Sequence, residues 1–122
     1  MARIIQTLKQ LRSEGIEGYF AIKYAEFAKD TSIMQEAYAN LADRVAAVMG
    51  KGIFLEVGPG PAFVSIEISK RILQAHIIGL DISETMIGIG RRNVAEAGLS
   101  ERITFRHGDA AKMPFDDAKF DF

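Results

Sequence analysis

The stretch Phe54-Leu55-Glu56-Val57-Gly58-Pro59-Gly60-Pro61-Ala62 is the most informative part of this 122-residue chain. It passes from a short apolar run through one carboxylate into a turn rich in glycine and proline. A strand that is buried on both faces of a parallel sheet has this apolar character, and proline is favoured in the first turn of a helix. The stretch therefore predicts a strand over 53–57, a tight turn, and a helix from Pro61 to about Leu73.

The alternation of strand and helix continues after this turn. The pattern predicts a strand over 76–80, a helix capped by Ser83 that ends at Ala97 before Gly98, and a strand over 103–106. Strands that alternate with helices at this spacing form βαβ units and a parallel sheet. Gly88 and Gly90 fall inside the second helix, where each costs about 1 kcal/mol relative to alanine, and the sequence gives no reason for them.

The first fifty residues are predicted to be helical, which divides the chain into a helical section over 1–50 and a sheet-forming section over 51–122. Apolar residues recur at helical spacing in three segments, namely 3–12, 19–28, and a helix that Thr31 or Ser32 caps and that ends at Gly50. The apolar stripe of the third helix is read as Met34, Tyr38, Leu41, Val45 and Val48.

The end of the sequence, Phe120-Asp121-Phe122, resembles the first residues of a fourth strand. A sheet of only three strands leaves one edge open and apolar surface bare. We therefore expect the chain to be the front half of a larger domain, or to cover that edge by association with another copy as a homo-oligomer.

Composition limits the function classes. With 48% hydrophobic and 25% charged residues, the chain is neither disordered nor membrane-spanning in character. A net charge of -1 gives no electrostatic reason to expect nucleic acid as a partner. No apolar run approaches the roughly 20 residues of a membrane span, and the N-terminus does not read as a signal peptide. A cytoplasmic location is the expectation.

Three kinds of cofactor site use a glycine-rich turn between a strand and a helix. A phosphate-binding P-loop requires lysine and Ser or Thr after its last glycine, whereas Pro61, Ala62 and Phe63 follow Gly60. The dinucleotide fingerprint requires a third glycine where this chain has Phe63. A P-loop is therefore excluded, and a dinucleotide-binding site is disfavoured.

The third kind is a resemblance to a known family. Residues 56–62 are similar to the acidic-x-Gly-x-Gly-x-Gly motif of class I S-adenosylmethionine-dependent methyltransferases, with Ala62 in place of the last glycine. Residues 76–86 and 108–122 resemble two further segments of that family, particularly of its quinone-biosynthesis branch. Together the three segments cover 53–122 in order.

The resemblance implies a Rossmann-like α/β fold and S-adenosylmethionine as cofactor. It implies that the turn with Glu56 binds the methionine end of the cofactor, that Asp81 holds both ribose hydroxyls, and that Ile82 lies against the adenine face. It also implies that Asp109 accepts from the adenine amino group and that the backbone N–H of Ala110 donates to a ring nitrogen. The cofactor-binding residues so implied are Glu56, Gly58, Gly60, Asp81, Ile82, Asp109 and Ala110.

No catalytic residue and no metal ligand is assigned. His76 is read as structural, and His107 is near the site in sequence but has no visible partner. Met86 and Phe115 are expected to belong to the core. The N-terminal aromatic residues are expected either to cover the cofactor as a lid or to pack onto the sheet; they are Tyr19, Phe20, Tyr24 and Phe27.

The function that the sequence favours is S-adenosylmethionine-dependent methyl transfer to a small-molecule acceptor, for which this chain supplies the cofactor-binding half. The 122-residue chain by itself is expected to be inactive or weakly active. Two alternatives stay open: a non-catalytic cofactor-binding or dimerising module, and an NAD-dependent oxidoreductase.

Overall fold

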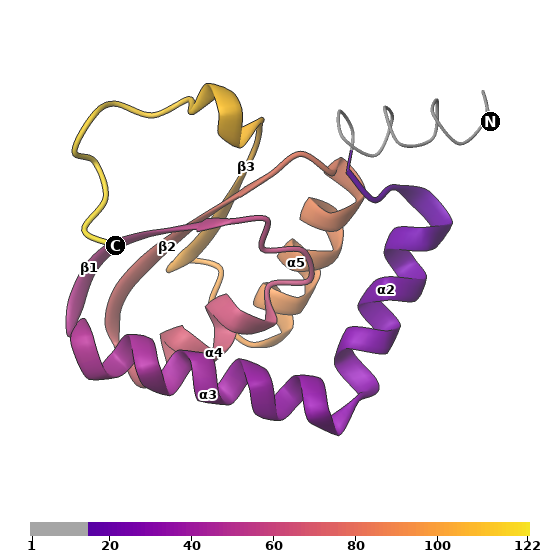
Figure 1. Cartoon of the computed structure of the whole chain (residues 1–122), viewed down its shortest axis with the longest axis horizontal. Helices are drawn as coiled ribbons and strands as arrows, with labels where there is room; N and C mark the ends of the chain where they lie inside the picture. The colour runs from indigo at the N-terminus through magenta and orange to yellow at the C-terminus, as the bar shows by residue number, and fades with distance from the viewer. Residues whose placement is uncertain (1–14) are drawn as a thin grey trace.

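The computed structural model describes residues 15–122 and shows a three-stranded sheet with helices packed beside it (Figure 1). The elements are α2 (Gly18–Asp30), α3 (Ser32–Val48), β1 (Lys51–Val57), α4 (Phe63–Arg71), β2 (Gln74–Asp81), α5 (Glu84–Glu96), β3 (Ile103–His107) and the short 3-10 helix η1 (Ala110–Lys112). The strands lie in the order β1-β2-β3 and both pairs are parallel. The predicted βαβ arrangement is confirmed, and the helix predicted over 3–12 lies outside the described residues.

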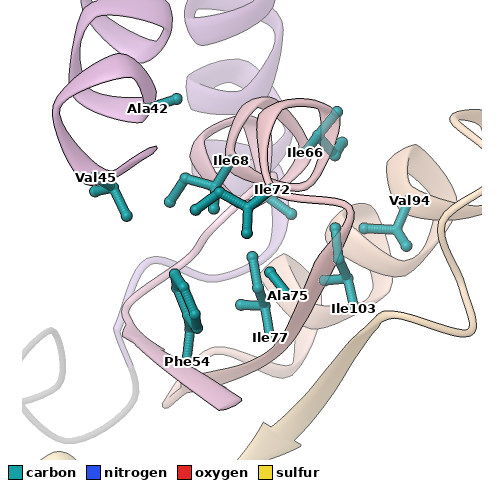
Figure 2. Packing of buried hydrophobic residues seen from close by; sticks show 11 residues of the cluster. Ala42, Val45, Phe54, Ile66, Ile68, Ile72, Ala75, Ile77, Val94 and Ile103 are labelled. Carbon is teal, nitrogen blue, oxygen red and sulfur yellow. The ribbon is translucent and has the colours of Figure 1, made fainter. Parts of the chain in front are cut away.

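One buried apolar cluster joins the sheet to the helices on one of its faces (Figure 2). Phe54 of β1 and Ile77 of β2 point toward Ile68 of α4. Ala42 and Val45 of α3 belong to the same cluster, so α3 shares its core with the sheet. The other members are Ala62, Ile66, Ile72, Ala75, Val94 and Ile103. Full burial of one large apolar side chain stabilises a fold by about 1.5–3 kcal/mol, so this cluster holds α4 and α5 on the sheet.

The helix α2 buries its alanines and exposes its aromatic residues. Ala21, Ala25 and Ala28 are buried along one stripe of the helix, on the side where α2 contacts α5. The four aromatic residues of this helix, from Tyr19 to Phe27, are 42–75% exposed. Of the two roles expected for these aromatic residues, packing onto the sheet is wrong, because the alanines occupy the buried stripe of α2 and the aromatic side chains lie outward.

The helix α3 also presents a different face from the one that its large residues indicate. Ala42 and Val45 are its buried residues, whereas Leu41 is 44% and Val48 is 70% exposed. The predicted stripe is therefore only partly correct. The close contact of α3 with α4 favours the small Ala42 at the centre of the interface over the larger Leu41 beside it.

The start of α4 lies later than the predicted start at Pro61. The helix begins at Phe63, because Ala62 before it has the left-handed conformation with φ 69° and ψ 23°. Gly58 and Gly60 also have positive φ, of 69° and 53°. A right-handed helix cannot include such residues, and the left-handed conformation costs an L-residue about 1–2 kcal/mol. Glycine adopts the left-handed conformation without this cost, which explains why the methyltransferase motif that residues 56–62 resemble has glycine at the position of Ala62.

The segment 120–122 lies along the free edge of β1 without forming a regular strand. The N–H of Asp121 donates to the Ile53 carbonyl at 2.8 Å, and the N–H of Leu55 donates to the Phe122 carbonyl at 2.9 Å. The Asp121 carboxylate also accepts from the N–H of Ile53 at 2.8 Å. Residues 120–122 are therefore not a strand in this structure, but these hydrogen bonds hold them at the edge of β1.

Gly90 of α5 marks a close approach between this helix and the glycine turn. A Cβ at this position would lie 2.9 Å from the Gly60 carbonyl oxygen and 2.9 Å from the ring of Phe105. At Gly88, in the same helix, nothing lies within 4 Å of such an atom. The structure therefore explains one of the two helical glycines that the sequence left without a reason.

We expect Gly90→Ala to destabilise the protein by about 1–3 kcal/mol, because the added methyl group overpacks the contact with the turn. Gly88→Ala is the matched control and is expected to stabilise by up to about 1 kcal/mol, since alanine is the better helix former. Urea unfolding of both variants measures the difference. Stabilisation of similar size in both would show that α5 does not contact the turn.

Candidate functional site

Main-chain hydrogen bonds join the carboxyl ends of the three strands. The N–H of Gly58, just after β1, donates to the Leu80 carbonyl of β2 at 2.8 Å. The N–H of Gly108, just after β3, donates to the Asp81 carbonyl at 3.0 Å. The loops that leave the strands therefore begin at one shared edge, which is where open parallel sheets bind their ligands.

The carboxylate of Asp81 holds the glycine turn. Its Oδ2 accepts from the N–H of Gly60 at 3.0 Å, and its Oδ1 accepts from the N–H of Ser83 at 2.9 Å. Asp81 is only 7% exposed, so these bonds fix its orientation. Each carboxylate oxygen can accept a second donor, which leaves Asp81 able to bind two hydroxyl groups.

The turn lies close over the sheet because β2 carries a glycine beneath it. A Cβ at Gly79 would come within 2.7 Å of Cγ of Pro59. Pro59 therefore packs directly on the backbone of β2. Met86, which is 4% exposed, lies next to Gly60 on the α5 side, and its predicted core position is confirmed.

Glu56 occupies the end of β1 as a partly buried acid. The hydroxyl of Ser65 from α4 donates to Glu56 Oε1 at 2.7 Å. Burial raises the pKa of Glu56, the Ser65 hydrogen bond acts in the opposite direction, and the nearby charge of Asp81 raises the pKa further. The two carboxylates therefore act on each other across the strand ends, and a cation beside them would relieve their repulsion.

The chain before α2 binds the first turn of α5, a contact that the sequence did not predict. The Ser83 hydroxyl donates to the Ile16 carbonyl at 2.6 Å, and Thr85 donates to the Glu17 carboxylate through both its N–H and its hydroxyl. Partial burial raises the pKa of Glu17, but the polar groups of Ser83 and Thr85 beside its carboxylate outweigh burial, so that the pKa is lowered. A carboxylate at a helix N-terminus also interacts favourably with the helix dipole.

The remaining residues of the predicted site follow β2 and β3. Ile82 is half-buried, whereas Asp109 and Ala110 are exposed. The Asp109 carboxylate accepts from the N–H of Ala111 at 2.8 Å and caps η1. Within 15–122, no hydrogen bond joins Asp109 to Glu56 or Asp81. The structure thus brings Glu56, the turn and Asp81 together, and places Asp109 on the neighbouring loop.

His107 has partners that the sequence did not reveal. Its Nε2 lies 2.9 Å from the Ile82 carbonyl oxygen, and its Nδ1 lies 3.8 Å from the Glu84 carboxylate. His76 is an exposed residue of β2. Phe115 is half-buried and packs edge-on against Phe120, with 4.9 Å between the ring centres, so it belongs to a local contact of the 108–122 segment.

The cavities beside α4 differ in whether they border the predicted site. One of about 220 Å³ borders Glu56 and Ser65 and is otherwise lined by apolar side chains of α3, β1, α4 and β2 together with Phe122. Another of about 450 Å³ lies among α2, α3, α4 and α5 and borders none of the predicted site residues. Between residues 15 and 122, no helix is long and apolar enough to cross a membrane, and no cluster of three potential metal ligands occurs in this part of the chain.

These features define a Rossmann-like α/β domain whose strand ends can hold a polar cofactor. A family model described as "Methyltransferase domain" matches residues 54–122, which is over half of the chain. The chain therefore belongs to this methyltransferase family. The quinone-biosynthesis resemblance is supported as well, because curated relatives of that type are found.

One such relative is the ubiquinone/menaquinone biosynthesis C-methyltransferase of Brucella anthropi, 42% identical over 60 residues, or 49% of this chain and 22% of that protein. A Methanococcus maripaludis structure, assigned as an S-adenosyl-L-methionine-dependent methyltransferase, has a TM-score of 0.75 at 28% identity, covering 81% of this chain and 45% of that one. A (4+2)-cyclase has a TM-score of 0.66 at 29% identity, covering 75% and 34%. The chain thus spans about a fifth of the curated relative and less than half of each structure.

We expect Glu56→Gln to stabilise the cofactor-free protein near neutral pH. Because the pKa of Glu56 is raised by burial and by Asp81, the folded protein binds a proton here more readily than the unfolded chain does. Stability of the original protein therefore falls as the pH rises from the ordinary glutamate pKa through the raised one. Glutamine removes this loss, so the gain should shrink toward about pH 4, where glutamate is largely protonated.

Glu67→Gln is the control with the opposite sign. Burial raises the pKa of Glu67, but its bonds with Arg71 and Lys70 outweigh this and lower the pKa. This carboxylate stabilises the fold above its ordinary pKa, and the contribution is lost as the pH falls through the lowered value. Urea unfolding as a function of pH measures both variants. A shift of the same sign in both would contradict the assignment for Glu56.

Proposed function

We propose that this chain binds S-adenosylmethionine at the strand ends and provides the cofactor site for methyl transfer to a small-molecule acceptor. The observation that carries the proposal is the bond between the Asp81 carboxylate and the N–H of Gly60, made in a chain of the methyltransferase family. This bond joins the acid that follows β2 to the turn that follows β1. In this proposal the site belongs to section 51–122, which the helices α2 and α3 of section 1–50 precede.

The donor and acceptor groups present fit this cofactor. Its methionine end carries a carboxylate, for which the first backbone N–H groups of α4, which have no partner within the helix, are donors. Gly58 and Gly60 donate their own N–H groups to Leu80 and Asp81, and their lack of a side chain would let the cofactor come close to the turn. The cofactor also carries an ammonium group, for which Glu56 is an acceptor. Asp81 would accept from both ribose hydroxyls. In the same proposal, Ile82 lies against the adenine ring, Asp109 accepts from the adenine amino group, and the N–H of Ala110 donates to a ring nitrogen.

The bound cofactor supplies an activated methyl group, and the chemistry of transfer is its own. The role of these residues is to hold the cofactor in one orientation, so that the acceptor meets the methyl group in line. Within the protein, Asp81 is held by its bonds to the N–H groups of Gly60 and Ser83. Preorganised groups of this kind lose little freedom on binding.

The name of the Brucella anthropi relative, a ubiquinone/menaquinone biosynthesis C-methyltransferase, supports a quinone-type ring as the acceptor, with a carbon atom as the site of transfer. The (4+2)-cyclase of similar fold favours a second candidate, in which the domain binds a cofactor without transferring a methyl group, because a fold by itself does not define an activity. A cytoplasmic location, the lack of a nucleic acid partner, and cover of the β1 edge by a second copy are further parts of the proposal.

Calorimetric titration of the chain with S-adenosylhomocysteine tests the cofactor. We expect binding, and at a ligand concentration of 100 times Kd it should stabilise the fold by about 2.7 kcal/mol. Glu56→Gln should weaken binding, whereas Glu67→Gln should not, because Glu67 lines the other cavity, which borders none of the predicted site residues. NADH serves as the rival ligand. Binding of NADH without binding of S-adenosylhomocysteine would overturn the proposal in favour of an oxidoreductase.

A further inference from the structure

The hydroxyl of Ser65 makes a contact that the proposed cofactor site does not yet explain. We propose that Ser65 is a positioning residue, which holds the Glu56 carboxylate in the orientation that receives a cationic amino group of the ligand. This inference rests on the proposed function for the identity of the ligand. It adds a residue of α4 to a site otherwise built from the loops that follow the strands.

The Ser65 side chain is buried, and Glu56 is the hydrogen-bond partner of its hydroxyl. It is 1% exposed, and its hydroxyl lies 2.7 Å from Glu56 Oε1. A serine inside a helix commonly donates to the carbonyl four residues earlier, which here belongs to Pro61. That carbonyl already accepts from Asn93 Nδ2 at 2.9 Å. The Ser65 hydroxyl is directed across to Glu56 of β1 and not back along its own helix.

The hydrogen bond from Ser65 is important because the other surroundings of Glu56 disfavour its charged form. The cavity beside Glu56 is lined by apolar side chains apart from Glu56 and Ser65 themselves; Leu41 and Val45 of α3 are among them. The titratable group that acts on Glu56 is Asp81 of β2, whose charge opposes ionisation, as burial also does. Ser65 is the neighbour that favours the charged form.

The second carboxylate oxygen is left for the ligand. Across residues 15–122, no hydrogen bond to Glu56 Oε2 is found, whereas Oε1 is engaged by Ser65. A carboxylate held through one oxygen has a defined direction for the other. An ammonium donor that reaches Oε2 would then form a charge-assisted hydrogen bond with an acceptor that is already oriented.

Ser69 provides a matched control within the same helix. It lies one turn after Ser65, is completely buried, and its hydroxyl has no hydrogen-bond partner in the described part of the chain. Both serine-to-alanine changes remove one buried oxygen and place the same residue in α4. They differ in whether a bond to Glu56 is lost.

The experiment compares Ser65→Ala, Ser69→Ala and Ser65→Thr with the original chain. Ser65→Thr retains the hydroxyl and adds one methyl group. The cavity next to Ser65, of about 220 Å³, offers space for that methyl group. The first measurement is an NMR titration of the Glu56 carboxyl carbon without ligand, assigned with Glu56→Gln. The second is the affinity for S-adenosylhomocysteine as a function of pH.

We expect Ser65→Ala to move the Glu56 titration to higher pH and to weaken binding about tenfold near neutral pH, as loss of one hydrogen bond to a charged group does. As the pH falls, its affinity should decline at a higher pH than that of the original chain. Ser69→Ala should change neither measurement, and Ser65→Thr should restore both.

An unchanged Glu56 titration in Ser65→Ala would overturn the inference, and so would unchanged affinity in that variant while the original chain binds. Equal losses in Ser65→Ala and Ser69→Ala would also overturn it, because they would show a general effect on α4. Failure of the original chain to bind S-adenosylhomocysteine would overturn the proposed function and, with it, the ligand assigned here, whatever the Glu56 titration shows.

Discussion

The hydrogen bond between the Gly60 N–H and the Asp81 carboxylate is the contact on which the arrangement of the site depends. It links a turn in left-handed conformation to the end of the neighbouring strand at 3.0 Å. The turn can take this position because Gly79 lies beneath Pro59 and Gly90 lies beside the Gly60 carbonyl. Three separate glycine positions thus serve one purpose, which is to bring backbone close to backbone where parallel strands end.

The carboxylate of Glu56 is electrostatically unfavourable in its charged form. Glu56 is partly buried and near Asp81, and both effects disfavour its charge. A protein selected for stability alone would have little reason to place a second acid there, since an uncompensated buried charge is costly. The arrangement is understandable if a positively charged group of a ligand completes it. The charge of Glu56 would then lower the stability of the folded protein without a ligand and raise its affinity for such a ligand.

Much of the fold was predictable because it depends on periodicity. The strands and α5 follow from apolar runs, from the Ser83 cap and from the stop at Gly98, and the structure has Ser83 accepting from the N–H of Met86 as a cap should. The start of α4 was misplaced because nothing in the sequence tells a proline in a turn from one in the first turn of a helix. The buried faces of α2 and α3 were not recognised, because the sequence was searched for large apolar residues. Where two helices pack closely, small residues such as alanine occupy the interface and large ones lie outside it.

The site was predictable to the extent that a motif carries it. The proximity of Glu56, Gly60 and Asp81 agrees with the motif-based expectation, whereas the roles of Ile82, Asp109 and Ala110 stay predictions. Ser65 and Glu17 were missed because their contacts join positions distant in the sequence. A serine nine residues after an acid has no signature. An acid that binds the helix start 68 residues later is equally undetectable.

The hydrogen bonds between 120–122 and β1 bear on the order in which the chain assembles. Paired residues of β1 and β2 are 23 positions apart, as Lys51 and Gln74 show, and those of β2 and β3 are 26 apart, as Ile77 and Ile103 show. Asp121 meets Ile53 across 68 positions. Closing the longer loop costs about 1 kcal/mol more in chain entropy. During synthesis on the ribosome, β1, β2 and β3 can therefore pair as each strand emerges, and the contact of 120–122 with the edge of β1 forms after these pairings.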